Sequence, residues 1–192
     1  MCSSDLKPFA GKTAIVTGAS KGIGRAIAQR LALDGANVVV AARDQAELDA
    51  LVSEIRASGG KAAALAIDLR NQDAPATLVK FAVKGFGKLD IIVANAGATK
   101  RGDFLELTDE DWADGFALKF FAHVRLIRTA WPHLKANSGS VVNISGVGGR
   151  TPGAEFAIGG SVNAAMITFT KALADLGVRD GVQVNAINPG LI

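Results

Sequence analysis

The chain is predicted to be an α/β protein whose doubly wound parallel sheet lies between two layers of helices. Short, almost uninterrupted apolar runs alternate along the sequence with amphipathic runs of ten residues or more. Such apolar strands are typical of a parallel sheet that crossover helices cover on both faces. No repeat, low-complexity tract or linker divides the 192 residues, so we expect one domain.

The first half of the chain is expected to alternate three strands with three helices. The strands are short apolar runs at 13–19 (TAIVTGA), 37–42 (NVVVAA) and 61–68 (KAAALAID). The helices are longer runs at 23–35, 45–59 and 71–87. In the first of them Ile23, Ile27 and Leu31 recur at a spacing of four, and in the third Leu78 and Phe81 share one face.

The second half continues the same alternation. Three further strands are expected at 88–97 (KLDIIVANAG), 138–145 (SGSVVNIS) and 181–190 (GVQVNAINPG). A long helix is expected over 109–136 and another over 160–177. The last helix has an apolar stripe at three- and four-residue spacing, made by Val162, Met166, Phe169, Leu173 and Leu176.

The composition argues against several classes of function. The formal charge is only +3 and no run of basic residues is interleaved with aromatic ones, so no nucleic-acid partner is expected. No apolar stretch approaches the roughly 18 residues that span a bilayer, and no signal pattern opens the chain, so we expect no membrane partner and a cytoplasmic location. Cys2 is the only cysteine and there are two histidines, so no disulfide framework or metal site is expected.

The stretch TGASKGIG (17–24) joins the first strand to the first helix and is the strongest binding motif. Gly18 permits a tight exit from the strand, Gly22 lets backbone approach a ligand, and Gly24 lets the helix pack closely on the sheet. The helix N-terminus then offers free N–H groups and a positive dipole to a pyrophosphate. We therefore expect a dinucleotide here, and the candidate residues are Gly18, Ser20, Lys21, Gly22, Ile23 and Gly24.

With this motif, four others follow in order: DL (68–69), NAG (95–97), NIS (143–145) and NPG (188–190). From about Phe9 to Ile192 the chain closely resembles the single-domain reductases of the short-chain dehydrogenase/reductase family. The resemblance implies an NAD(P)(H)-dependent oxidoreductase acting on a small carbonyl or alcohol substrate. It places Asp68 and Leu69 at the adenine end of the cofactor. It also places six residues along the ribose and nicotinamide: Asn95, Ala96, Gly97, Ile144, Pro189 and Gly190. Alternatively, or in addition, the side chain of Asn95 bonds to backbone in a turn.

The catalytic positions depart from the family. Its active site is an Asn-Ser-Tyr-Lys tetrad, and the chain has no tyrosine. Alignment on FTKALA (169–174) puts the tyrosine position at Gly159, the lysine at Asn163, the serine at Gly146 and the asparagine at Lys119. Neither of the two glycines carries a side chain that can act.

Three residues remain as candidate catalytic groups: Lys119, Ser145 and Asn163. Relative to the tetrad, lysine and asparagine have exchanged positions, since Lys119 stands where the family has asparagine and Asn163 where it has lysine. Lys119 either is a solvated charge, or keeps a positive charge beside the cofactor, or acts itself as the proton donor. Asn163 would bond a ribose hydroxyl, and Ser145 would orient a substrate oxygen.

The cofactor is expected to be NADP in preference to NAD. The second strand ends VVVAARD (38–44), which offers Arg43 but no carboxylate where NAD-binding proteins place one. Lys21 lies in the glycine turn of the same region. Asp44 is expected to cap the following helix instead of binding a ribose.

Two expectations concern the ends. Residues 1–8 are interpreted as a tail, of which 1–6 are either a sequencing artefact or an ordinary N-terminus, and 9–192 as one Rossmann domain. The family closes its sheet with a seventh strand, so we expect this chain to be a C-terminally incomplete fragment lacking the last strand. In the family, the helices at 109–136 and 160–177 often form a dimer interface. A full-length homo-oligomer, dimer or tetramer, is therefore implied, with a purely intramolecular face as the alternative.

Two functions remain open from the sequence, in addition to the possibility that this fragment is inert. The first is an oxidoreductase with a non-standard proton donor. The second is a non-catalytic NADP(H)-binding protein that regulates or partners another.

Overall fold

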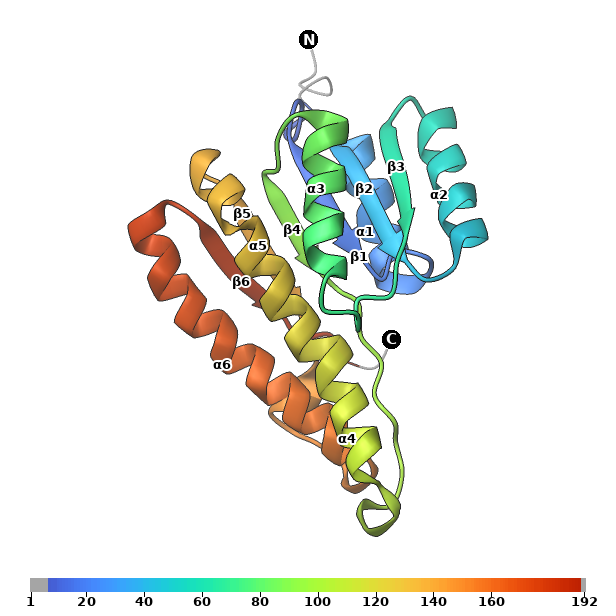
Figure 1. The fold of residues 1–192 in the computed structure, drawn as a ribbon, viewed down its shortest axis with the longest axis vertical. Coiled ribbons are helices and arrows are strands. Elements are labelled where there is room, and N and C mark those ends of the chain that lie inside the picture. Colours follow the sequence, from blue (N-terminus) through green and yellow to red (C-terminus); the bar gives the residue numbers. More distant parts are fainter. Residues whose placement is uncertain (1–6, 191–192) are drawn as a thin grey trace.

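A computed structural model describes residues 7–190, which form a six-stranded sheet in which every strand pairs in parallel (Figure 1). The strand order is β3-β2-β1-β4-β5-β6. The strands are β1 Thr13–Thr17, β2 Asn37–Ala42, β3 Lys61–Ala66, β4 Ile91–Ala94, β5 Ser140–Ile144 and β6 Gln183–Ile187. This is the order of doubly wound dinucleotide-binding folds, and it confirms the predicted class. The interpretation of residues 1–6 lies outside the described residues.

Helices cover both faces of the sheet, as continuously apolar strands require (Figure 1). They are α1 Gly22–Leu33, α2 Gln45–Ala57, α3 Ala74–Phe86, α4 Asp109–Phe116, α5 Ala122–Ala136 and α6 Ala157–Asp180. One core forms beneath α3, α5 and α6, where Leu78 and Leu126 are fully buried. A second core forms beneath α1 and α2, around Val16 and Leu48. No helix within residues 7–190 is long and apolar enough to cross a membrane.

The helix predicted over 109–136 is interrupted by one π-helical turn. This turn, Ala117–Phe121, separates α4 from α5. Wider turns of this kind are rare and are found frequently at functional sites. The turn contains Lys119, one of the candidate catalytic residues.

The helix predicted over 160–177 extends at both ends and runs from Ala157 to Asp180. Gly177 does not end the helix. Its role is close packing, because a Cβ at this position would strike the carbonyl oxygen of Val182. The helix ends at Gly181, whose φ of +71° is the left-handed conformation that glycine adopts easily. Three short 3₁₀ turns complete the fold: Phe104–Glu106, Val147–Gly149 and Ala154–Phe156.

Candidate functional site

The site lies where the strand order reverses. From β1 the chain winds to β2 and β3 on one side, and from β4 to β5 and β6 on the other. Loops that leave the carboxyl ends of β1 and β4 therefore diverge and leave a crevice between them, where this fold class binds ligands. Gly18 follows β1 and Asn95 follows β4, so the two predicted motifs meet at this crevice.

Thr17 and Asn95 tie the two loops together. The Thr17 hydroxyl oxygen accepts hydrogen bonds from the backbone N–H groups of Asn95 and Ala96, each at 3.0 Å. The Asn95 amide donates to the carbonyl oxygens of Thr17 at 2.9 Å and Gly18 at 3.2 Å. Asn95 thus has the backbone-bonding role expected as one alternative.

The glycine turn has the geometry that the motif predicts, with roles that differ between its glycines. Gly18 and Gly22 have φ of +64° and +57°, which residues with a Cβ rarely adopt. A Cβ on Gly24 would strike the Gly18 carbonyl oxygen and lie 2.5 Å from the Asn95 amide nitrogen, so α1 can approach the sheet only with glycine here. Helix α1 begins at Gly22, and its N-cap, Lys21, makes no side-chain cap bond. The first N–H groups of α1 are therefore left for a ligand.

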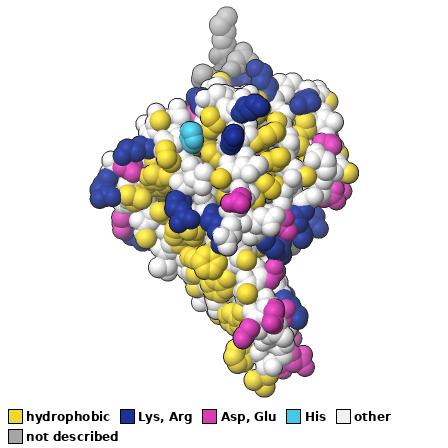
Figure 2. All heavy atoms as spheres, viewed as in Figure 1, with side chains coloured by type: hydrophobic (Ala, Val, Ile, Leu, Met, Phe, Trp, Pro, Cys, Tyr) yellow, Lys and Arg dark blue, Asp and Glu magenta, His cyan; other side chains and the backbone are white. Residues whose placement is uncertain are grey.

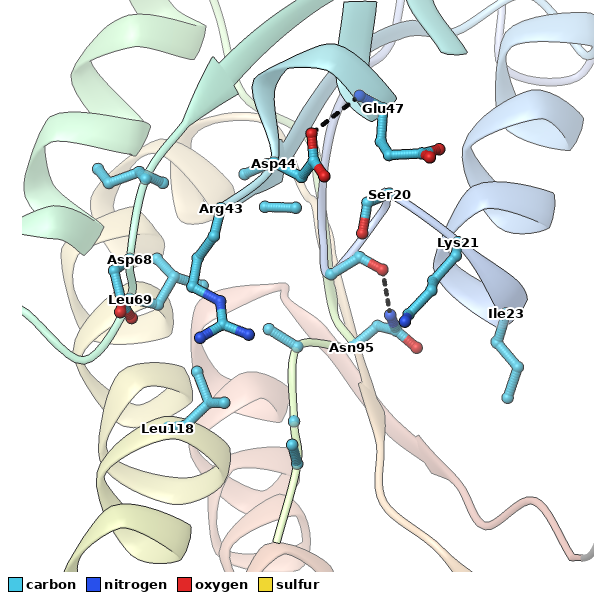
Figure 3. Close-up of a pocket in the computed structure, with 17 residues that line it drawn as sticks. Ser20, Lys21, Ile23, Arg43, Asp44, Glu47, Asp68, Leu69, Asn95 and Leu118 are labelled. Carbon is cyan, nitrogen blue, oxygen red and sulfur yellow. Dashed lines mark hydrogen bonds between the residues drawn. The ribbon is translucent and has the colours of Figure 1, made fainter. Parts of the chain in front are cut away.

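A cavity of about 670 Å³ opens over this turn and the ends of β2 and β3 (Figure 3). Ten of the predicted cofactor-binding residues line it: Gly18, Ser20, Lys21, Ile23, Arg43, Asp68, Leu69, Asn95, Ala96 and Gly97. Gly22 and Gly24 do not line it; Gly22 gives the turn its positive φ, and Gly24 allows the close packing of α1.

Charges around this cavity are of both signs. Arg43 and Lys21 are exposed side chains that line it, from the end of β2 and from the glycine turn (Figure 3). Asp44 accepts a hydrogen bond from the backbone N–H of Glu47 at 3.2 Å and caps α2, as predicted. Asp68 is held by Arg70, whose backbone N–H donates to it at 3.0 Å. Two of the nearby carboxylates are thus engaged with the protein.

A second cavity, of about 920 Å³, adjoins the first and shares Ile23, Asn95 and Gly97 with it. It contains the remaining predicted residues: Lys119, Ile144, Ser145, Gly146, Asn163, Pro189 and Gly190. Gly159 is buried and does not line it. The cavity therefore lies at three of the four positions that the alignment assigns to the tetrad, and it contains different functional groups.

The three candidate catalytic residues form one connected chain. The Lys119 Nζ donates to the backbone carbonyl oxygen of Ser145 at 3.1 Å. The Ser145 hydroxyl donates in turn to the backbone carbonyl oxygen of Asn163 at 3.0 Å. The π-helical turn and α6 are thereby linked through the residue that follows β5, and the Ser145 hydroxyl keeps lone pairs but has its proton engaged.

Lys119 is a half-buried cation without a carboxylate. Within residues 7–190 no acidic side chain pairs with it, and burial lowers the pKa of its ammonium group. Its methylene groups lie over Gly97, where a Cβ would be only 2.8 Å from Cδ. Desolvation favours the neutral amine, so this nitrogen is a better proton donor near neutral pH than an exposed lysine.

Asn163 is almost fully buried, and its Oδ1 has no hydrogen-bond partner in the described chain. A Cβ on Gly146 would lie 2.7 Å from the Asn163 Nδ2. Gly146, at the serine position, therefore leaves free the space that the side chain of Asn163, at the lysine position, occupies. An unpartnered buried oxygen at the edge of a cavity is costly unless a ligand or water bonds to it.

The space at the tyrosine position is filled by Phe156, which the sequence analysis did not identify. A Cβ on Gly159 would strike the Phe156 ring, and one on Gly148 would lie 2.8 Å from it. The guanidinium carbon of Arg101 lies 4.3 Å from the centre of the same ring. Phe156 and Arg101 both line the second cavity. The sequence feature that could have identified this contact is an aromatic residue three positions, about one helical turn, before Gly159.

His123 lies behind the site, where it contacts the backbone of Ala96, and the sequence did not identify this role. It is fully buried, and its Nε2 lies 2.8 Å from the Ala96 carbonyl oxygen. Burial is the main cause that lowers its pKa to about 4, and the neighbouring charge of Lys119 adds to it. The ring is therefore neutral at pH 7, and Nε2 carries the proton that it donates to Ala96.

The fold and site together define a doubly wound α/β protein with a ligand crevice at its switch point. The model of the short chain dehydrogenase family matches residues 12–192, and the chain belongs to this family of short-chain dehydrogenases and reductases.

Individual relatives agree with this assignment. The chain is 42% identical over 190 residues to an uncharacterized oxidoreductase of Mycobacterium tuberculosis (strain CDC 1551 / Oshkosh), covering 98% of this chain and 72% of the relative. It is 38% identical over 185 residues to tropinone reductase-like 3 of Erythroxylum coca, covering 96% and 71%. The crystal structure of L-sorbose reductase from Gluconobacter frateurii, complexed with NADPH and L-sorbose, superposes with a TM-score of 0.92 at 32% identity, covering 95% of this chain and 70% of that one.

Gly159→Ala is expected to lower the free energy of unfolding by about 1 kcal/mol. The new methyl group displaces the Phe156 ring, an overpacking cost of about 1–3 kcal/mol, from which the roughly 1 kcal/mol that alanine gains over glycine in a helix is subtracted. Urea denaturation measures the change. Adding Phe156→Ala should remove the penalty of the glycine substitution. Gly153→Ala is the matched control, since a Cβ there meets nothing within 4 Å. Equal effects at 153 and 159 would contradict the packing argument.

His123 is expected to make stability depend on pH. Its folded pKa is about 4, below the usual 6.5, so the unfolded chain takes up the proton first and stability is lost as the pH falls below 6.5. Between pH 7 and pH 5 the free energy of unfolding should fall by about 2 kcal/mol more in the parent than in His123→Gln. Urea denaturation at both pH values tests this, and identical pH dependences would refute it.

Proposed function

We propose that the chain is an NADP(H)-dependent oxidoreductase that transfers a hydride between the cofactor and a small carbonyl or alcohol substrate at a non-standard active site. The observation that carries the proposal is the pair of adjoining cavities at the switch point. One is lined by the glycine turn and the other by Lys119, Ser145 and Asn163. A cytoplasmic location belongs to the same proposal and is supported by a composition with a single cysteine, Cys2.

The residues present fit a dinucleotide. The unpaired first turn of α1 suits a pyrophosphate, and the unpartnered Oδ1 of Asn163 suits a ribose hydroxyl. Arg43 and Lys21 are the cations available to a 2′-phosphate, while Asp44 is occupied as a helix cap. Binding of NADPH by L-sorbose reductase, a structural relative, supports the same assignment.

The chemistry divides between the cofactor and the chain. The nicotinamide, when bound, supplies or accepts the hydride. In the chain, Lys119 donates a proton from Nζ to the carbonyl oxygen of the substrate, because no phenol is available and its pKa is lowered by burial. The Ser145 hydroxyl donates its proton to the backbone carbonyl oxygen of Asn163, and its lone pairs accept a hydrogen bond from the hydroxyl group of an alcohol substrate.

A non-catalytic NADP(H)-binding protein, acting as a regulator or partner, is the second candidate. It is favoured by the loss of all four tetrad side chains and by Phe156, which occupies the space next to Gly159. In this case the connected chain from Lys119 to Asn163 would hold the binding site together without performing turnover.

A homo-oligomer, dimer or tetramer, is part of either proposal. Figure 2 shows hydrophobic side chains over the region of α5 and α6, with basic residues among them. Phe121, in the π-helical turn before α5, is 46% exposed, and the Phe120 ring of the same turn packs edge to face on Phe169 of α6, with ring centroids 5.7 Å apart. A second copy of the chain would bury this surface.

Arg43→Ala is expected to weaken NADPH binding about tenfold while changing NADH binding much less. A guanidinium bonded to a phosphate contributes about 1.5–3 kcal/mol, and only NADPH has the 2′-phosphate. Fluorescence titration of both cofactors measures the two dissociation constants. Arg30→Ala, an exposed arginine paired with Asp34 on α1, is the control. Equal losses for the two cofactors would exclude the assigned role of Arg43.

Lys119→Ala is expected to reduce NADPH-dependent carbonyl reduction by about 10²–10⁴-fold while NADPH affinity changes little, because the proton donor is removed. Asn163→Ala should instead raise the dissociation constant for NADPH. Steady-state rates on a panel of aldehydes and ketones, with cofactor titrations beside them, separate the two effects.

Lys171→Ala, an exposed lysine on α6 paired with Asp175, serves as the control. If the parent binds NADPH but reduces no carbonyl, the non-catalytic candidate is the correct one. If Lys119→Ala reduces carbonyls as fast as the parent, Lys119 is not the proton donor.

A further inference from the structure

Lys119 occupies an environment unlike that of the other cavity lysine. Lys21 lines the first cavity as an exposed side chain, whereas Lys119 is half-buried in the wall of the second. Its one hydrogen bond to another residue of the described part of the chain goes to the backbone carbonyl oxygen of Ser145. The charged groups that share this cavity are Arg101 and Glu155, both exposed, and neither forms an ion pair with Lys119 among residues 7–190. The nearby His123 is neutral at pH 7.

This environment favours the neutral amine. A lysine withdrawn from water without a carboxylate loses part of the preference for its charged form, and burial does lower the pKa of Lys119. An amine that donates one N–H to Ser145 still has its lone pair. Desolvated lysines of this kind are the ones that add to carbonyl compounds and form Schiff bases.

The cavity leaves room for such a reaction. Lys119 and Ser145 both line it. The volume of about 920 Å³ is at the upper end of ordinary small-molecule pockets. A small aldehyde or ketone can therefore enter and reach Nζ.

We propose that Lys119 captures aldehydes and ketones in the second cavity as a covalent imine. The Nζ lone pair forms a bond to the carbonyl carbon, giving a carbinolamine. The carbonyl oxygen then leaves as water and takes both hydrogens of the amine, so that a C=N bond replaces the C=O bond. No electrons are gained or lost, and the protons are exchanged with solvent water. The inference goes beyond the proposed function, in which Lys119 only donates a proton.

Borohydride trapping tests the imine without any cofactor. The 192-residue chain is incubated with butanal at pH 7.5, treated with sodium borohydride, digested, and analysed by peptide mass spectrometry. Butylation at Lys119 should exceed that at the exposed Lys61 and Lys171, because burial lowers the pKa of Lys119 and so raises the fraction of its side chain that is a free amine. Labelling of Lys119 no greater than that of these surface lysines overturns the proposal.

Two controls make the result specific. Lys119→Arg keeps the charge but cannot form this imine, so its other lysines should be labelled as in the parent; circular dichroism establishes that it folds. If this variant fails to fold, the comparison of Lys119 with the other lysines of the parent still decides whether Lys119 is selectively labelled. NADPH oxidation is measured separately. Carbonyl reduction without selective labelling of Lys119 supports the proposed function and refutes the imine. Selective labelling of Lys119 without carbonyl reduction supports the imine and contradicts the proposed function.

Discussion

The close approach of α1 to the ends of β1 and β4 is the constraint on which the site depends. It is possible only because Gly24 has no side chain to strike Gly18 or Asn95. Thr17 and Asn95 then hold the two loops with four hydrogen bonds that involve backbone groups on both sides. Any larger residue at position 24 would separate the helix N-terminus from the sheet and open the crevice at its base.

Much of the fold and of the first cavity could be predicted, because both depend on local patterns. Strands buried on two faces are apolar throughout, and the glycine turn needs positive φ at Gly18 and Gly22. Asp44 could be assigned as a helix cap because the residue type and its position before a helix are both typical of caps. Helix ends were less certain, since the role of Gly177 is decided by the contact with Val182, which is a matter of packing and not of propensity.

The second cavity could be located but its interior could not be described from the sequence. Alignment placed Lys119, Ser145 and Asn163 at one site, and the structure brings them together. The hydrogen bond from Lys119 to the backbone carbonyl of residue 145 cannot be predicted from residue types, because any residue there has the same carbonyl group. Likewise, the buried state of His123 and its bond to Ala96 follow from tertiary packing alone.

The Phe156 ring next to Gly159 also couples two positions of the chain. A tyrosine introduced at 159 alone would collide with the ring, because even a Cβ strikes it. A phenol could therefore stand at 159 only together with a smaller residue at 156. That second change would also remove the ring over which the Arg101 guanidinium lies, so the charge at the wall of the second cavity would lose its aromatic support.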